Sequence, residues 1–284
     1  MKLGVAGLLP EWQRIDRASA EKVRTAGFLG AQVFFQRPLE ADPADVKRVK
    51  EAFDAAGLEV CQANGWYECL VNPDETLRAE GMKGVRALCR LGKLLDAKSV
   101  YVRPGSLNPN GPWYPHPENH TPATFERLVD SLKQAATAAQ SAGMTLALEG
   151  HVLSPLDTPQ RVRDVLDAVG SPALRFNIDP VNFIGNVRDA HDPTRLLNEL
   201  FDLLGKDIVA AHIKDCALND ELVLHIDEVL LGTGTMDNGL VLRRMSELCL
   251  QAYCLIEHLP DDKVPQARKA LCSLAERLGL PLEY

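Results

Sequence analysis

The segment Thr145-Leu-Ala-Leu-Glu-Gly-His151 is a short apolar run that ends in a carboxylate and an imidazole. Side chains alternate between the two faces of a strand, so Glu149 and His151 lie on one face and Leu146 and Leu148 on the other. A strand exposed on one face would carry polar residues along its whole length. Here they collect at the carboxyl end, which is where a barrel of alternating strands and helices places its functional groups.

Three later apolar runs end in the same way, on a residue that can bind a metal or move a proton. These runs are 174–179, which ends on Asp179, 208–214, which contains His212, and 253–257, which ends on Glu257. In a barrel of parallel strands, the carboxyl ends of all strands converge on one region. We therefore expect these three residues and Glu149 to meet there.

Segments of strand and helix character alternate along the whole chain. The predicted strands cover 3–8, 31–36, 58–64, 98–103, 145–151, 174–179, 208–214 and 253–257, and the predicted helices cover 14–26, 42–56, 72–96, 121–142, 158–169, 193–204, 240–250 and 265–278. Strict alternation predicts parallel strands with helical crossovers. Eight such units in 284 residues predict an α/β fold, a single (β/α)8 TIM barrel over 1–284, with a doubly wound sheet as the alternative.

The segment 105–122 is rich in Gly, Pro and Asn, and it is longer than a simple connection requires. Loops of this length in compact domains are usually functional or disordered. Trp113, Tyr114 and His116 lie within it, and they favour an active-site loop.

The composition restricts the compartment and the partners. The net charge is -8 with both signs mixed along the chain, which argues against a nucleic-acid partner because phosphate binding requires a concentrated basic surface. No apolar run approaches the ~20 residues of a membrane span, and the first residues become polar too early for a signal peptide. Seven cysteines without a CxxC pair indicate a reducing compartment, with neither a disulfide framework nor a thiolate metal site. We expect a cytoplasmic protein that acts on a small molecule.

Glu149, Asp179, His212 and Glu257 follow four consecutive strands, and the alternation of side chains points all four into the barrel. Three carboxylates cannot share a dry pocket as free ions, because each raises the pKa of the others. A divalent cation would remove this repulsion. Oxygen donors with one imidazole predict a single divalent ion, Mn²⁺ before Mg²⁺, Co²⁺, Fe²⁺ or Zn²⁺.

Each of the four residues also has a structural explanation. Glu149 could form a salt bridge or cap the next helix, and Asp179, which precedes Pro180, could serve a turn. His212 could be a hydrogen-bonded core histidine, and Glu257 could pair with an arginine. Four independent roles at the ends of four consecutive strands explain the pattern less economically than one metal site.

The same residues suit proton transfer on a sugar. Isomerising or epimerising a sugar removes a C–H proton next to a carbonyl. A metal ion stabilises the resulting enediolate by several kcal/mol. Glu149 and Glu257 lie on non-adjacent strands and could flank the substrate as acid and base, each contributing about 10²–10⁴-fold. Which of them is the base stays open.

Other polar residues could contact the substrate. His151 and Lys214 share the inward direction of Glu149 and His212. Arg103 ends the fourth strand and could bind a carboxylate, a phosphate or a neighbouring Glu.

Two further residues, Asn64 and Trp66, follow the third strand and could form a hydrogen bond and an apolar wall for a sugar ring, although core packing is an alternative for Trp66 and Trp113. Gly232-Thr-Gly-Thr is expected only to shape its loop, and His258, out of phase with Glu257, is expected to act through its neighbours or structurally.

The motifs resemble those of the xylose isomerase-like sugar isomerase and epimerase superfamily, and the resemblance spans essentially the whole chain. They are Leu-Glu-Gly-His at 148–151, Asn-Ile-Asp-Pro-Val-Asn at 177–182, His-Ile-Lys-Asp at 212–215 and Ile-Glu-His at 256–258. This superfamily contains ketose 3-epimerases, hydroxypyruvate isomerase, inosose dehydratase and, more distantly, endonuclease IV.

The resemblance implies a metal set of Glu149, Asp179, His212 and Glu257 with the two glutamates as acid and base, and it implies a homo-oligomer, a dimer or tetramer. Many relatives carry a substrate-binding His three residues after the strand-six Asp, where this chain has Asn182. The specific substrate is therefore not transferred.

Three other functions remain open on the same scaffold. A lyase acting on a keto-sugar or inosose would begin with the same proton abstraction and then lose a β-leaving group. An endonuclease IV-like phosphodiesterase would need more metal-binding histidines and a basic DNA-binding face. A non-catalytic sugar-binding barrel would be favoured by loss of a metal ligand, and all four ligands are present.

Overall fold

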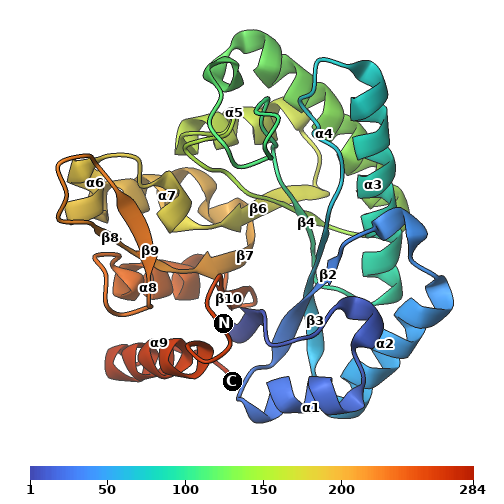
Figure 1. Ribbon diagram of the computed structural model, residues 1–284. Helices are drawn as coiled ribbons and strands as arrows, with labels where there is room; N and C mark the ends of the chain where they lie inside the picture. The colour runs from blue at the N-terminus through green and yellow to red at the C-terminus, as the bar shows by residue number, and fades with distance from the viewer.

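The computed structural model describes residues 1–284, in which eight parallel strands close into a barrel (Figure 1). The strands pair in the order β1-β10-β7-β6-β5-β4-β3-β2, and β2 pairs with β1 to close the ring. They are β1 (Lys2–Ala6), β2 (Gly30–Phe35), β3 (Glu59–Gly65), β4 (Val100–Val102), β5 (Leu146–Leu148), β6 (Leu174–Ile178), β7 (Ile208–Ile213) and β10 (Tyr253–Glu257). The closed ring confirms the predicted TIM barrel and excludes a doubly wound sheet.

Helices surround the barrel and connect its strands (Figure 1). They are α1 (Arg17–Thr25), α2 (Pro43–Ala56), α3 (Glu75–Leu94), α4 (Pro122–Ala142), α5 (Pro159–Val169), α6 (Val187–His191), α7 (Thr194–Leu204), α8 (Asn238–Leu248) and α9 (Val264–Leu278). None of them is long and apolar enough to cross a membrane.

Local capping explains where the helices begin and end. In α2, Asp42 accepts a hydrogen bond from the amide of Ala44, and the helix ends on Gly57 with a left-handed φ of 62°. The predicted start of the first helix at position 14 is wrong, because Asp16 and Ser19 form a reciprocal capping box and α1 begins only at Arg17. The short helix α6 was not predicted.

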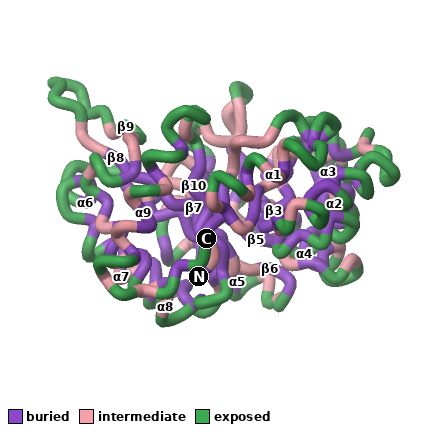
Figure 2. Tube along the Cα trace, turned by 90° about the horizontal axis from the view of Figure 1, so that it is seen from below, coloured by how far each residue is buried: buried purple, intermediate pink, exposed green.

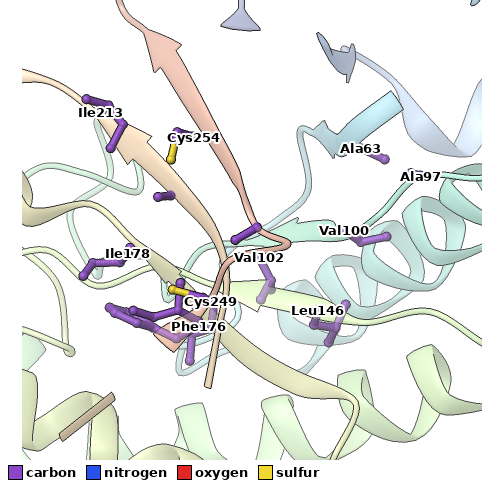
Figure 3. Close-up of a cluster of buried hydrophobic side chains, with 14 of the residues drawn as sticks. Ala63, Ala97, Val100, Val102, Leu146, Phe176, Ile178, Ile213, Cys249 and Cys254 are labelled. Atoms are coloured by element: carbon purple, nitrogen blue, oxygen red, sulfur yellow. The ribbon is translucent and has the colours of Figure 1, made fainter. Parts of the chain in front are cut away.

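The apolar core lies between the barrel and its helices. Its main cluster contains 72 buried residues. Figure 3 shows part of it, with Val100, Leu146, Phe176 and Ile178 projecting from adjacent strands. Burial of each large apolar side chain stabilises the fold by about 1.5–3 kcal/mol. A second cluster has only three buried residues, Cys61, Tyr253 and Leu255. Most apolar packing therefore lies outside the ring of strands, which leaves its interior for polar groups.

An antiparallel hairpin that the sequence analysis did not predict follows β7. It consists of β8 (Asp215–Leu218) and β9 (Ile226–Val229) and projects from the body of the molecule (Figure 2). At its tip, the side chains of Leu222, Val223 and Leu224 are exposed.

The buried carboxylate of Asp215 anchors the base of this hairpin. It accepts hydrogen bonds from the backbone amides of Cys216, Gly232, Gly234 and Met236 at 2.9–3.0 Å. The glycines let the chain approach closely, since a Cβ on Gly234 would lie 2.3 Å from Asp215. The glycine-rich stretch thus shapes its loop, as predicted.

Candidate metal centre

Four adjacent strands bring the predicted ligands together. Glu149 directly follows β5, Asp179 directly follows β6, His212 lies within β7, and Glu257 is the last residue of β10. One ligand atom from each residue lies within 4.8 Å of the others, and all four residues are buried. The cluster could hold a metal ion.

The cluster carries more negative charge than its own cations neutralise. Lys214 Nζ lies 2.8 Å from Asp179 Oδ2 and 2.9 Å from Glu257 Oε1. His212 Nδ1 lies 2.9 Å from Glu149 Oε1 and 3.1 Å from Glu257 Oε2. Even with a protonated imidazole, three carboxylates face only two cations. A divalent cation that replaced one imidazole proton would neutralise the remaining charge.

Burial and these charges shift the pKa values in opposite directions. Burial lowers the pKa of His212, but Glu257 and Glu149 outweigh it and raise that pKa to about 10. Burial opposes ionisation of Glu257, yet His212 and Lys214 hold its pKa well below the usual range. Burial raises the pKa of Asp179, and Lys214 offsets this only in part. Opposed shifts among neighbouring groups are typical of functional sites.

Three buried atoms of the cluster lack a hydrogen-bond partner. They are both carboxylate oxygens of Asp179 and Nδ1 of His212, whose charged neighbours lie close but outside hydrogen-bonding geometry. Buried polar atoms are normally paired. A metal ion would supply the missing partner, so the donors fit one. The carbonyl of Asp179 accepts the amide of Asn182 in the turn that opens the short helix η4 (Pro180–Phe183), but its carboxylate does not cap this helix, so the turn role does not explain the carboxylate.

Buried amides fix the imidazole. His212 Nε2 lies 3.1 Å from Gln62 Oε1, and the same oxygen accepts a hydrogen bond from Gln32 Nε2 at 2.8 Å. Because this oxygen accepts, His212 keeps a hydrogen on Nε2. A metal ion would then replace the proton that the carboxylates favour on Nδ1, and Nδ1 would be the ligand atom.

Glu149 is held by two neighbouring side chains. Asn177 Nδ2 donates to Glu149 Oε1 at 2.8 Å, and the hydroxyl of Tyr101 donates to Glu149 Oε2 at 2.7 Å. Gln62 Nε2 in turn donates to Asn177 Oδ1 at 3.1 Å. Sequence reasoning missed these residues. The available signal was a polar side chain inside an apolar strand, as Gln62 is in β3 and Asn177 is in β6.

The cluster opens into a cavity of about 670 Å³. This volume lies within the ordinary range of ligand pockets. All six residues predicted to bind substrate line it, and their contacts with substrate stay predictions. These residues are Asn64, Trp66, Arg103, His151, Asn182 and Lys214.

Arg103 is engaged by the protein itself. Its guanidinium donates to the carbonyl oxygens of Gly65 at 2.9 Å and Tyr67 at 2.7 Å. It also lies over the rings of Tyr67, at 3.9 Å from the centroid, and Trp66, at 5.1 Å. Of the three alternatives for Arg103, the pairing with a neighbouring glutamate is not found, and binding of a substrate carboxylate or phosphate stays a prediction.

Two histidines border the same cavity. Burial lowers the pKa of His151 to about 4, and its Nδ1 accepts a hydrogen bond from the amide of Leu153. His258 was expected to be out of phase, yet it lines the cavity. Its φ of 58° breaks the strand alternation after Glu257, and its Nδ1 lies 3.1 Å from Glu228 Oε2.

The loop after β4 contributes one side chain to the cavity. Trp113 lines it and packs against the ring of His151, with the centroids 5.5 Å apart. Tyr114 does not line the cavity, and His116 caps the short helix η3 (Pro117–His120). An active-site role for 105–122 therefore depends on Trp113.

The sequence profile of the xylose isomerase-like TIM barrel family matches residues 20–276. The chain belongs to this family. No curated protein matches it in sequence.

Three solved structures illustrate the similarity to this family. A D-tagatose 3-epimerase-like protein superposes with a TM-score of 0.77 at 17% identity, covering 98% of both chains. The 3-keto-D-glucoside 4-epimerase of E. coli has a TM-score of 0.74 at 18% identity, covering 97% of this chain and 99% of its own. A xylose isomerase-like protein from Mycobacterium smegmatis, in complex with magnesium, has a TM-score of 0.74 at 15% identity, covering 98% of this chain and 96% of its own. At these identities the similarity shows the fold.

Proposed function

We propose that this protein is a divalent-metal-dependent sugar isomerase or epimerase. The observation that carries this proposal is the buried cluster of Glu149, Asp179, His212 and Glu257, in which three candidate ligand atoms have no hydrogen-bond partner. Membership of the xylose isomerase-like family and the similarity to sugar epimerases support a small sugar as the substrate.

The four residues would hold one divalent ion, with Mn²⁺ as the first candidate. When bound, it would supply Lewis-acid stabilisation of the charge that develops on the substrate oxygen. The hydrogen bond from His212 to Gln62 keeps the ligand tautomer, and Lys214 offsets part of the carboxylate charge.

We assign proton transfer to Glu149 and Glu257. Their strands, β5 and β10, are separated in the barrel by β6 and β7, so the two carboxylates approach the cavity from different sides. Asn177 and Tyr101 orient Glu149, and Lys214 holds Glu257. One carboxylate removes the proton next to the carbonyl, and a carboxylate returns a proton to the enediolate.

The test is proton exchange with solvent. The Mn²⁺-loaded protein is incubated in D₂O with a panel of ketoses, free keto-sugars and phenyl glycosides of keto-sugars, and NMR follows deuterium incorporation next to the carbonyl. We expect incorporation and a new isomer for at least one sugar, with both lost in Glu149→Gln and Glu257→Gln. Incorporation followed by a dehydrated product would identify the lyase alternative. Absence of incorporation across the panel would contradict the proposal.

We also propose a cytoplasmic homo-oligomer, a dimer or tetramer. The exposed side chains of Leu222, Val223 and Leu224 support assembly, because exposed apolar clusters often mark contact surfaces. Light scattering on the purified chain should give a multiple of 31.2 kDa. A monomer at micromolar concentration would contradict it.

A further inference from the structure

The two permanently charged cations that line the cavity are both engaged by protein groups. Lys214 lies between Asp179 and Glu257, and Arg103 donates to two backbone carbonyls. The hairpin strand β9 adds the acidic side chains of Asp227 and Glu228 to the lining. A phosphate group on the substrate would meet these acids and would find no free cation.

The histidines of the cavity do not change this balance. His258 is paired with Glu228, and His151 is half-buried with its Nδ1 hydrogen-bonded to the amide of Leu153. The remaining polar groups are neutral amides next to an apolar wall. Asn64 is bonded to Gln32 and to the amide of Gly65, and the Nδ2 of Asn182 is free to donate to a ligand. Such a lining suits hydroxyl groups and not a charged ester.

The apolar wall has an exposed aromatic ring at its edge. Trp66 is 52% exposed, although a large apolar side chain that only packs the core would be buried. Its ring is held by Phe34, in an edge-on arrangement with the centroids 5.9 Å apart, and by the guanidinium of Arg103. The ring is therefore fixed in position while half of it faces solvent.

Trp66 also joins the main cavity to a second one. A hollow of about 380 Å³ lies next to the loop that follows β4, and both Trp66 and Arg103 line the two spaces. The main cavity of about 670 Å³ already exceeds what one monosaccharide ring fills. The space beside Trp66 is thus available for a second part of the substrate.

We propose that the substrate is an uncharged glycoside whose reacting sugar carries a ketone and lies at the carboxylate cluster, and whose second ring stacks on Trp66. This inference rests on the proposed function and specifies its substrate class. It distinguishes this chain from an enzyme of free monosaccharides and from an enzyme of sugar phosphates.

The test compares three forms of one sugar. The Mn²⁺-loaded protein is titrated calorimetrically with several hexoses, each as the free sugar, the 6-phosphate and the phenyl glycoside. For at least one hexose we expect the glycoside to bind about tenfold more tightly than the free sugar, as stacking on an exposed ring allows. The phosphate should bind no more tightly than the free sugar.

Variants of Trp66 test whether its ring causes the tighter binding of the phenyl glycoside. Trp66→Ala should reduce the preference for the phenyl glycoside to less than about twofold, and Trp66→Phe should retain most of it. Leu250→Ala, which truncates an exposed apolar residue that lines neither cavity, serves as the matched control and should change nothing.

Three results would overturn the inference: tighter binding of a phosphate, no preference for any glycoside, or a preference that survives Trp66→Ala. The deuterium-exchange experiment does not involve Trp66. Exchange on a free keto-sugar without a glycoside preference would overturn this inference alone, and a failed exchange would contradict the proposed function itself.

Discussion

The two ends of the barrel interior both contain carboxylates, but only at the amino end does the carboxylate have enough hydrogen-bond donors and cations around it. At the amino end, Glu59 accepts a hydrogen bond from the Tyr253 hydroxyl and lies 3.0 Å from Lys2 and 3.3 Å from Lys98. At the carboxyl end, three carboxylates share Lys214 and His212, and neither oxygen of Asp179 has a hydrogen-bond partner.

This difference separates stability from function within one barrel. A carboxylate with its own donors stabilises the fold, whereas crowded carboxylates without enough donors destabilise it until a cation binds. Damage to the amino end should therefore affect folding. Damage to the carboxyl end should affect metal binding and catalysis.

The largest expected effect is on catalysis. Glu149→Gln and Glu257→Gln should each lower the exchange rate by about 10²–10⁴-fold, because each removes a proton-transferring group. The free energy of unfolding of metal-free Glu149→Gln should not fall, since the change removes one of three repelling charges. Glu257→Gln also removes the partner of Lys214 and His212 and should lower it. Urea unfolding checks this, and a loss of about 2 kcal/mol or more in Glu149→Gln would show that the carboxyl end is a structural ion cluster.

The next effect is stabilisation by the ion. Added Mn²⁺ at a hundred times its dissociation constant should raise the free energy of unfolding by about 2.7 kcal/mol. His212→Ala should abolish this increment, while Tyr253→Phe, at the other end of the barrel, should retain it. Thermal or urea unfolding with and without Mn²⁺ measures both, and equal increments in the two variants would place the ion elsewhere.

A smaller effect is expected at Gln62, which hydrogen-bonds to His212. Gln62→Leu removes the acceptor that fixes the hydrogen of His212 on Nε2, and it should weaken Mn²⁺ binding by about 10–100-fold. Gln62→Glu keeps an acceptor at the same place, and because the site is fully buried its carboxyl is expected to be protonated and to donate to Asn177 in place of the amide. This variant should bind nearly as well as the unmodified protein. Calorimetry compares the two, and equal loss in both would mean that Gln62 only fills space.

The smallest effect concerns the amino end. Tyr253→Phe removes a donor to the partly exposed Glu59 and should lower the free energy of unfolding by about 1 kcal/mol. Although burial opposes ionisation of Glu59, Tyr253, Lys2 and Lys98 lower its pKa from 4.5 to about 2. Because the folded pKa is the lower one, this stabilisation is complete above pH 4.5 and is lost as the pH falls towards 2.

Urea unfolding of Glu59→Gln against pH checks the sign. The free energy of unfolding of this variant should lie below that of the unmodified protein by a constant amount above about pH 5, and the difference should shrink below that pH. Metal binding should be unchanged in this variant. A difference in unfolding free energy that grows on acidification would contradict the stabilising role of ionised Glu59.

The fold could be predicted because its signals are local. Apolar runs mark the strands, and residues such as Gly57 and Gly143 mark the ends of helices. The hairpin β8–β9 escaped prediction because its strands have four residues each, and their pairing depends on Asp215 binding amides 17–21 positions away. No local pattern carries that information.

The ligand positions could also be predicted, because strand alternation determines which side chains face inward. The predicted inward direction of Lys214 agrees with the structure, but the groups that surround it depend on three other strands. The direction of the His258 side chain was predicted incorrectly because its left-handed backbone interrupts the strand alternation. Gln62 and Asn177 could have been found as polar residues within apolar strands, since a buried amide requires a partner.

The most direct test of the central claim is calorimetric titration of Mn²⁺ into chelator-treated protein. We predict one site per chain in the unmodified protein and in Tyr253→Phe, and none in His212→Ala. Absence of binding in the unmodified protein, or equal binding in His212→Ala, would contradict the assignment of the carboxyl end of the barrel as a metal centre.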